Sequence, residues 1–250
     1  MNNVQVRLLQ LVVLAGAYGS FVLLSQAFPF FPLPHLVLKT TFEFFVTGEI
    51  YTHVGITLYE TVVGHAIAIV GGIAIGVLLG ASRKFGEIFE PIILSAYAVP
   101  KIILLPVLLL IFGVGLTTKI ANATIHGIFP VIINTSAGAR EVNRVLIKAA
   151  RSMRATRWQI FRKVYFPSMV LPTFAGIRLG LGFAFLGSLL AEIFEAKMGL
   201  GFLVVHYYNT IQIPQMLAVI LFVFMLVIAI NAGMKAIEAH FSRWRGTWIR

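Results

Sequence analysis

Six long apolar stretches constrain this chain of 250 residues more than any other feature. Each is about as long as the roughly 20 residues that a helix needs to cross the hydrocarbon core of a bilayer. They cover residues 8–27, 56–81, 92–112, 117–137, 168–192 and 213–236. The stretches are continuous rather than alternating, which favours helices over the strands of a barrel. We therefore predict an all-α, polytopic transmembrane helical bundle of about six spans.

The composition leads to the same class. Hydrophobic residues make up 59% of the chain and charged residues only 12%, so too little polar surface remains to coat a soluble domain. Neither an internal repeat nor a low-complexity linker divides the sequence, and residues 1–250 are predicted to form one transmembrane domain. The first stretch is longer than the apolar core of a signal peptide, so we expect it to remain as a span.

Lysine and arginine gather on one side of the predicted spans. The N-terminal segment carries one, segment 82–91 carries two, the 138–167 loop carries eight and the tail after residue 236 carries three, against Lys39 and Lys197 on the other side. The eight loop residues are Arg140, Arg144, Lys148, Arg151, Arg154, Arg157, Arg162 and Lys163. This asymmetry predicts a cytoplasmic loop and two cytoplasmic termini. The net charge of +11 therefore orients the spans, and a nucleic-acid partner is not expected.

Two chemically versatile residue types are missing. The chain has no cysteine, and its nine acidic residues are all glutamate. Thiolate metal sites, thiol nucleophiles and aspartyl-phosphate chemistry are therefore excluded. No metal-ligand cluster or nucleophile–base pair is visible in the sequence, so we expect neither an enzyme nor a bound cofactor in this chain.

The basic loop contains a short amphipathic segment. Between Thr156 and Tyr165 the apolar residues recur at helical spacing, basic residues occupy the other side, and Pro167 is expected to end the helix. Two interpretations remain open from physics alone. Such a helix can lie on an anionic leaflet, or its aromatic side can enter a groove on a partner protein.

The loop resembles the cytoplasmic loop of permease subunits of ABC importers. That family has Glu-Ala-Ala, a glycine after three residues, and Ile-x-Leu-Pro after nine more. This chain has Lys148-Ala149-Ala150, Arg154 and Val164-Tyr165-Phe166-Pro167 with every spacing kept. It departs from the pattern where Lys148 replaces glutamate and Arg154 replaces the glycine that permits a turn.

Further segments, in the same order along residues 30–205, resemble the nitrate/sulfonate/taurine branch of this family. They are Phe31-Pro32-Leu33-Pro34, Pro100-Lys101-Ile102, Leu105-Pro106, Phe112-Gly113-Val114-Gly115, Phe129-Pro130, Asn134-Thr135, Leu171-Pro172, Ala175-Gly176-Ile177-Arg178, Ala191-Glu192 and Gly199-Leu200-Gly201. The resemblance implies the fold of type I ABC importer permeases and a bacterial cytoplasmic (inner) membrane location.

The resemblance also implies partners. Two permease copies would form the pathway, two separate cytoplasmic ATPase subunits would bind ATP and Mg, and an extracytoplasmic solute-binding protein would deliver the solute. The phosphate-loop pattern is absent from this chain, in keeping with a separate ATPase. The implied ATPase-coupling residues within 148–167 are Ala149, Ala150, Arg154, Arg157, Trp158, Phe161, Val164 and Pro167.

Polar side chains inside the spans are candidates for lining a pathway, because ionisable groups are costly in hydrocarbon. Glu60 and His65 lie early in the second stretch, one turn apart, a spacing at which the two side chains can pair. Asn122, His126 and Asn134 share one face of the fourth stretch. Hydrogen bonding between helices is the alternative role for the stripe.

Other residues have structural interpretations beside functional ones. Small residues recur every fourth position in the second and fifth stretches, which indicates close helix packing, a sliding surface or a dimer contact. Lys101 is expected to be structural, and Arg178 either reaches the headgroups or braces the loop. Glu192 and Glu195 are expected to be solvated or to contact a binding protein. Prolines 100, 106 and 130 are expected to kink their helices.

The function that follows is a membrane permease of an ATP-driven importer, which moves a small solute inward by alternating access. By resemblance the solute is an organic or inorganic anion such as a sulfonate, taurine, nitrate or an aromatic acid. One alternative is a permease for a thiamine-precursor pyrimidine or another neutral or cationic solute. Another is a stand-alone secondary transporter, for which only Glu60 is a candidate coupling acid.

Overall fold

The computed structural model describes residues 32–195 and 197–242, with isolated positions before them, and this part of the chain is helical without strands. Its elements are α2 (Pro34–Thr47), α3 (Glu49–Ala81), α4 (Arg83–Ala98), the 3₁₀ turn η1 (Lys101–Leu104), α5 (Leu105–Phe112), α6 (Leu116–Arg140), α7 (Arg144–Ser152), α8 (Arg157–Ile160), the π-helical turn η2 (Phe161–Tyr165), α9 (Phe166–Glu195), α10 (Leu200–Asn209) and α11 (Ile213–Ser242). The predicted all-α class is confirmed. The predicted span 8–27 lies for the most part outside the described residues.

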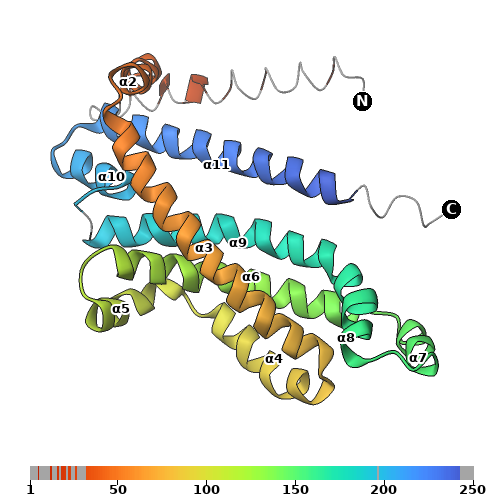
Figure 1. Ribbon diagram of the computed structural model, residues 1–250. Coiled ribbons are helices and arrows are strands. Elements are labelled where there is room, and N and C mark those ends of the chain that lie inside the picture. The colour runs from red at the N-terminus through yellow and green to blue at the C-terminus, as the bar shows by residue number, and fades with distance from the viewer. Residues whose placement is uncertain are drawn as a thin grey trace.

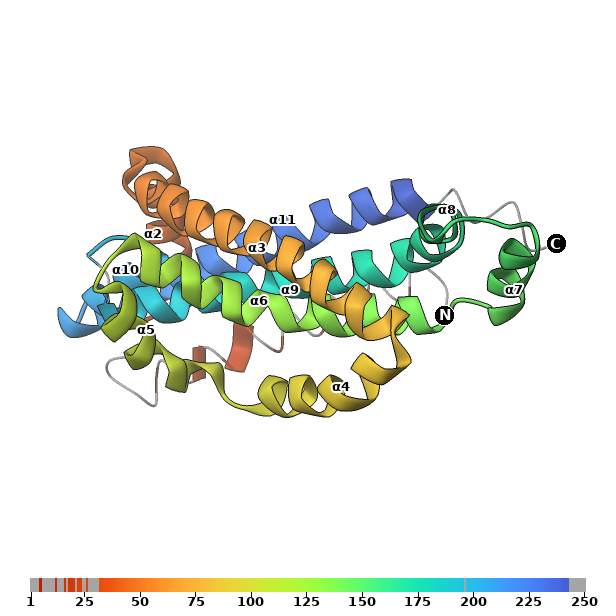
Figure 2. The same ribbon diagram turned by 60° about the horizontal axis from the view of Figure 1, so that its bottom comes forward.

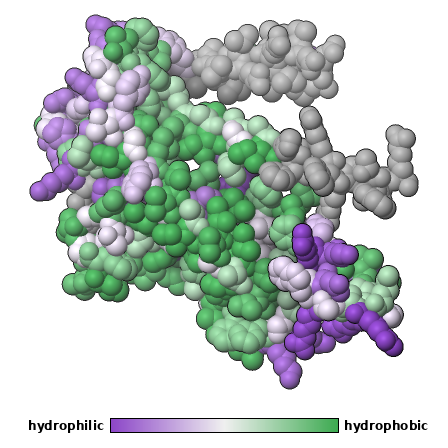
Figure 3. Space-filling model, in the orientation of Figure 1, coloured by the Kyte–Doolittle hydropathy of each residue, from purple (hydrophilic) through white to green (hydrophobic). Residues whose placement is uncertain are grey.

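The long helices run along one direction of the molecule. Helices α3, α6, α9 and α11 extend from one end to the other, with α2, α5 and α10 gathered at one end and α7 and α8 at the opposite end (Figures 1 and 2). We call these the α10 end and the α7 end. Figure 3 shows apolar residues along the sides and hydrophilic residues at both ends. This distribution suits a bundle that stands across a bilayer.

Four described helices are long and apolar enough to cross a membrane: Glu49–Ala81, Leu116–Arg140, Arg157–Phe194 and Ile213–Ile237. They correspond to four of the predicted spans. Residues 92–112 do not form one straight helix, because α4 and the η1–α5 segment meet at 90°; the kink expected at Pro100 is confirmed, and the two helices together pass as one bent span. Val99 and Pro100 are extended, because proline restricts the residue before it and lacks an N–H to continue the helix.

The two other prolines do not interrupt the helices that contain them, and the kink expected at Pro130 stays a prediction. Pro130 lies inside the continuous helix α6, and Pro106 occupies the first turn of α5. Proline is tolerated in the first turn because the N–H that it lacks would have had no partner inside the helix.

Helix α6 lies between α3 and α9 and contacts both along their length. A Cβ added at Gly64 of α3 would lie 2.6 Å from Cβ of Ala123, and one added at Gly76 would lie 2.7 Å from Cβ of Thr135. On the other side, Gly180 of α9 approaches the backbone of Gly127. The small residues therefore pack the helices of one chain against each other, in keeping with the packing interpretation rather than the dimer contact.

A second cluster of buried apolar side chains fills the α10 end. Its members come from α2, α3, α10 and α11 and include Phe44, Ile50, Leu200, Leu203 and Val219. Neither α2 nor α10 was foreseen from the apolar stretches, because each is shorter than a span. Together they join α11 to the three-helix packing of α3, α6 and α9.

Candidate functional site

The basic loop at the α7 end folds into two helices joined by a tight turn. Asn143 caps α7 by accepting a hydrogen bond from the Val145 N–H at 2.8 Å. Thr156 starts α8 with a reciprocal capping box, in which the Gln159 side chain accepts from the Thr156 N–H at 2.8 Å. These caps satisfy the backbone donors that helix starts leave without partners.

Arg154 makes the turn between the two helices. Its φ is 57°, the left-handed region that favours glycine, and its N–H donates to the Arg151 carbonyl at 2.9 Å. The turn that the family's glycine permits is therefore kept at the position that the spacing indicated, with arginine in the same backbone conformation. A non-glycine residue in this region costs about 1 kcal/mol.

Several large apolar side chains of this loop are exposed. Trp158 is 66% exposed and Met153 83%, and Val145 and Leu146 of α7 also face solvent. The Trp158 ring stacks on Phe161 at 5.7 Å between centroids. Ala149 and the neighbouring arginines, including Arg157, are exposed as well, whereas Ala150 and Val164 are half-buried. The loop thus presents an apolar patch framed by positive charge (Figure 3).

Pro167 does not end a helix, contrary to the sequence prediction. The helical run continues from Arg157 to Phe194 through η2, and Pro167 lies near the start of α9. In η2 the Phe166 N–H bonds to the Phe161 carbonyl five residues back. This wider turn gives room for the proline ring, which would otherwise clash with a carbonyl of the preceding turn. The amphipathic segment and α9 therefore form one continuous element.

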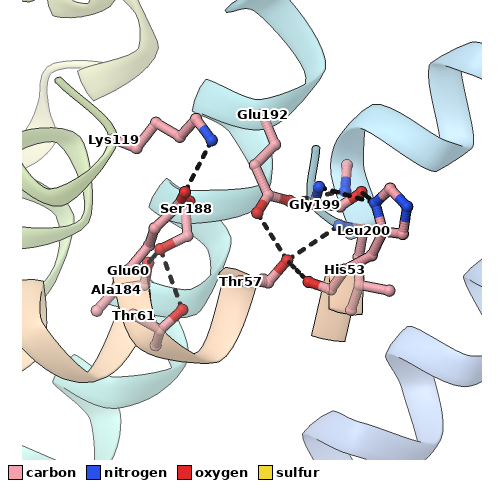
Figure 4. A network of polar contacts seen from close by, with 11 residues as sticks. His53, Thr57, Glu60, Thr61, Lys119, Ala184, Ser188, Glu192, Gly199 and Leu200 are labelled. Carbon is pink, nitrogen blue, oxygen red and sulfur yellow. Dashed lines mark hydrogen bonds and ion pairs between the residues drawn. The ribbon is translucent and has the colours of Figure 1, made fainter. Parts of the chain in front are cut away.

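The candidate pathway residues lie in the contacts between α3, α6 and α9. Glu60 is fully buried and accepts a hydrogen bond from Lys119 Nζ at 2.7 Å (Figure 4). Glu60 does not pair with His65, because Lys119 comes from the facing helix α6 whereas His65 lies against α9 beside Gly180. The buried pair links α3 to α6.

The polar stripe of α6 makes hydrogen bonds in this arrangement. Asn122 Nδ2 donates to the Gly187 carbonyl of α9 at 2.7 Å, and Asn134 Nδ2 donates to the Pro130 carbonyl at 2.8 Å. His126 Nδ1 lies 2.8 Å from the Asn122 carbonyl. These contacts fit the alternative of bonding within and between helices. A role of the stripe in lining a pathway stays a prediction.

The role of Glu192 was not predicted from the sequence. This residue is 1% exposed and lies at the α10 end, where its carboxylate accepts from Thr57 Oγ1 at 2.6 Å and from the Gly201 N–H at 2.8 Å (Figure 4). The Leu200 N–H donates to Thr57 Oγ1 at 2.9 Å. Glu192 therefore caps the start of α10 with a carboxyl group, which accepts from a backbone N–H that the helix start leaves without a partner.

The Gly199-Leu200-Gly201 segment wraps around this carboxylate. Gly199 has a φ of 119°, and a Cβ there would lie 2.2 Å from the Glu192 carboxyl carbon. The Gly199 N–H donates to Nδ1 of His53 on α3 at 3.0 Å. The available sequence signal was an acid followed by two glycines, together with a threonine on another span. Which of these residues bond to one another is determined by the fold. Glu192 is neither solvated nor at the surface, which corrects the prediction.

Lys101 has contacts that suit the structural role expected for it. Its Nζ donates to the Tyr97 carbonyl at 2.8 Å and lies 4.5 Å and 5.1 Å from the ring centroids of Tyr97 and Phe129. Lys101 therefore braces the bend between α4 and α5 against α6. Among the described residues, no group of three or more histidine or glutamate side chains is arranged to hold a metal ion.

Comparisons with known proteins agree with this arrangement. Residues 68–246 match the model of a family described as the binding-protein-dependent transport system inner membrane component. The taurine transport system permease protein TauC of Escherichia coli is 28% identical over 94% of this chain and 88% of its own length. The nitrate import permease protein NrtB of Synechocystis is 29% identical over 77% of this chain and 73% of its own length. The inward-facing MetNI methionine ABC transporter matches with a TM-score of 0.68 and 26% identity, over 77% of this chain and 95% of its own.

Proposed function

Because the chain belongs to the family of binding-protein-dependent transport system inner membrane components, we propose that it moves a small organic or inorganic anion inward by alternating access. The solute class is supported by relatives named for taurine and nitrate. As a member of this family the chain is a multi-pass permease of an ABC importer, and ATP hydrolysis belongs to a separate subunit.

We propose that the α7 end docks on the ATPase. The observation that carries this proposal is the apolar patch around Trp158 and Met153, exposed beside arginines on a chain whose other apolar surface suits lipid. Large exposed apolar patches with a polar rim mark interaction surfaces. The loop end is then cytoplasmic, with both termini on that side, and ATP and Mg are bound by the partner.

Continuity between the loop and α9 supports a mechanical route. The element that carries Trp158 continues without interruption into α9, which packs against α6. A displacement of the docking patch therefore reorients α9, and the transmembrane helices change between two arrangements. The chain performs no chemistry in this scheme.

We further propose that two copies of this chain form the pathway, with the α10 end toward the solute-binding protein. Glu60, His65 and Asn122 are enclosed within α3, α6 and α9 of one chain. They would reach a pathway only in a state where these helices separate. This makes the stripe a candidate for a contact made during transport rather than for a resting binding site.

The docking proposal is tested by replacing Trp158 with alanine. We expect the variant to fold and insert but to lose most co-purification with the ATPase and most ATP-driven uptake. Phe42→Ala is the matched control, since Phe42 is an aromatic residue of similar exposure at the α10 end. Uptake and ATPase association that survive Trp158→Ala unchanged would overturn the proposal.

The solute class is tested on the assembled transporter. We expect the co-purified binding protein to retain a small anion, identified by mass spectrometry of the bound solute, and ATP to drive its uptake into vesicles. Retention of a neutral pyrimidine would replace the proposed solute class. Uptake driven by an ion gradient with this chain alone would replace the whole mechanism with that of a secondary transporter.

A further inference from the structure

Three ionisable side chains meet inside the bundle, where α3, α6 and α9 pack together (Figure 4). They are Glu60 on α3, Lys119 on α6 and Glu192 on α9, and all three are buried. The carboxyl groups of Glu60 and Glu192 lie close enough to interact with each other, and Lys119 interacts with both. We call these three residues the Glu–Lys–Glu cluster.

The charges of this cluster do not balance when every member is ionised, because two carboxylates face one ammonium group. Among the described residues, the ion pair of Lys119 with Glu60 is the only one that reaches the cluster. His53 is the other titratable side chain of the network, and its Nδ1 accepts from the Gly199 N–H. One negative charge would therefore remain without a counterion, which is costly at a site that water does not reach.

Glu60 also has a carboxylate oxygen without a partner. Its Oε1 accepts from Lys119 Nζ at 2.7 Å, whereas its Oε2 is buried and has no hydrogen bond within the described part of the chain. The neighbouring Glu192 carboxyl cannot donate to Oε2 while both groups are ionised, because ionised carboxylates are acceptors only. A single proton on either carboxyl would supply the missing donor.

Glu192 receives few hydrogen bonds for a buried carboxylate. From α10 it accepts one backbone N–H, that of Gly201, and from α3 it accepts the Thr57 hydroxyl. That hydroxyl also lies 3.1 Å from the His53 carbonyl, so its one hydrogen is shared between two acceptors. The ionised form of a buried carboxylate is favoured where two or three backbone N–H groups donate to it. A proton shared with Glu60 would offset this shortage.

We propose that the Glu–Lys–Glu cluster is a proton-binding site, in which one proton is shared between Glu60 Oε2 and the carboxyl of Glu192 while α3, α6 and α9 are packed together. The proton comes from water, and with it the cluster carries no net charge. When these helices separate, both carboxyls reach water, where carboxyls ionise at neutral pH, and the proton returns to the solvent. Proton binding therefore stabilises the packed arrangement, and a rise in pH favours separation of the helices.

The proton can be detected by infrared spectroscopy of the full-length, detergent-solubilised chain near neutral pH. A protonated carboxyl has a C=O stretching band that an ionised carboxylate lacks. We expect this band in the unmodified chain and its loss in Glu192→Gln and in Glu60→Gln, because each variant leaves one carboxylate to balance Lys119. Glu43→Gln is the matched control, since Glu43 forms an exposed ion pair on α2, and it should leave the band unchanged.

The pH dependence of unfolding provides a second measurement. The packed state is expected to bind one proton more than the unfolded state, so stability should fall as the pH rises. The unfolding equilibrium constant should then increase by up to about tenfold per pH unit between about pH 6 and pH 9. In Glu192→Gln this contribution should be absent, whereas Glu43→Gln should keep it.

Two results would overturn the site. One is the absence of the band from the unmodified chain, which needs no substitution, or its persistence in either glutamine variant that folds. The other is an equal pH dependence of unfolding in the unmodified chain and in Glu192→Gln. The site stands on the geometry of the chain alone, and the measurements include neither ATPase nor solute, so its failure leaves the proposed function intact.

Discussion

The two ends of the bundle use polar residues in opposite ways. At the α10 end, the buried carboxylate of Glu192 is enclosed by hydrogen bonds from α3 and α10 within the same chain. At the α7 end, arginines and the ring of Trp158 face outward, and α7 packs only lightly on the rest of the bundle. At the α10 end the polar groups bond to each other within the chain, whereas at the α7 end they are exposed.

Because of this difference, substitutions at the two ends are expected to affect the stability of the fold differently. A buried polar network is stabilising only when its members are satisfied, so changes at the α10 end act on the fold itself. Exposed side chains contribute little to folding, so changes at the α7 end are expected to leave the fold intact. Helix α9 joins the two ends, since it carries Glu192 at one terminus and continues into the docking patch at the other.

The largest effect is expected from Lys119→Met. Removing the partner leaves the buried Glu60 carboxylate uncompensated, which costs about 3–5 kcal/mol. Thermal unfolding of the detergent-solubilised chain measures the loss, and adding Glu60→Gln is expected to recover part of it. Arg83→Met breaks an exposed pair with Glu87 and should leave the unfolding temperature almost unchanged. Equal losses in the two variants would show that the Glu60–Lys119 pair is not buried as described.

Glu192→Ala is expected to cost about 1–3 kcal/mol, because the Gly201 N–H and the Thr57 hydroxyl lose a buried partner. Glu192→Gln keeps an acceptor and is expected to lose less. The same unfolding measurement applies, with Glu43→Ala on the exposed face of α2 as the control. If Glu192→Ala unfolds at the temperature of that control, Glu192 does not cap α10.

Arg154→Gly is expected to stabilise the loop by about 1 kcal/mol or less, because glycine adopts a positive φ without strain. Limited proteolysis of the 138–167 loop measures the change as slower cleavage. Arg151→Gly, inside α7, provides the opposite control, since glycine within a helix destabilises it. Faster cleavage of Arg154→Gly would contradict the left-handed turn.

The smallest effect on folding is expected from Leu146→Ser on α7. The side chain is already exposed, so the free energy of unfolding should change by less than about 0.5 kcal/mol. ATPase co-purification is expected to fall in the same variant. A large drop in the unfolding temperature with unchanged association would mean that α7 serves the fold rather than docking.

The apolar stretches of the sequence predicted the helices that are long enough to cross a membrane. Four long helices follow directly from apolar length, and the loop spacing indicated a turn at Arg154. The proline predicted a kink at Pro100 but not its size, because apolar composition continues across it while the backbone turns by 90°. The length of an apolar stretch indicates that it is buried in the membrane, but it does not indicate the direction in which the backbone runs.

The polar contacts depend on which helices are neighbours. Glu60 and His65 are one turn apart in the sequence, yet Glu60 bonds to Lys119 because α6 packs on α3 through Gly64. Glu192 looked like a surface acid because it lies at the end of a span. Its burial depends on α10, a helix that is too short to be recognised in the sequence as an apolar span.

The continuity of the helical run from Arg157 to Phe194 has a geometric consequence. Helix α9, which makes up most of this run, has 30 residues and is about 45 Å long at 1.5 Å per residue. Tilting α9 about its first residue by about 5° would displace its last residue by about 4 Å. A small tilt imposed at Trp158 would thus become a larger displacement at the opposite end of α9, where Glu192 contacts α10.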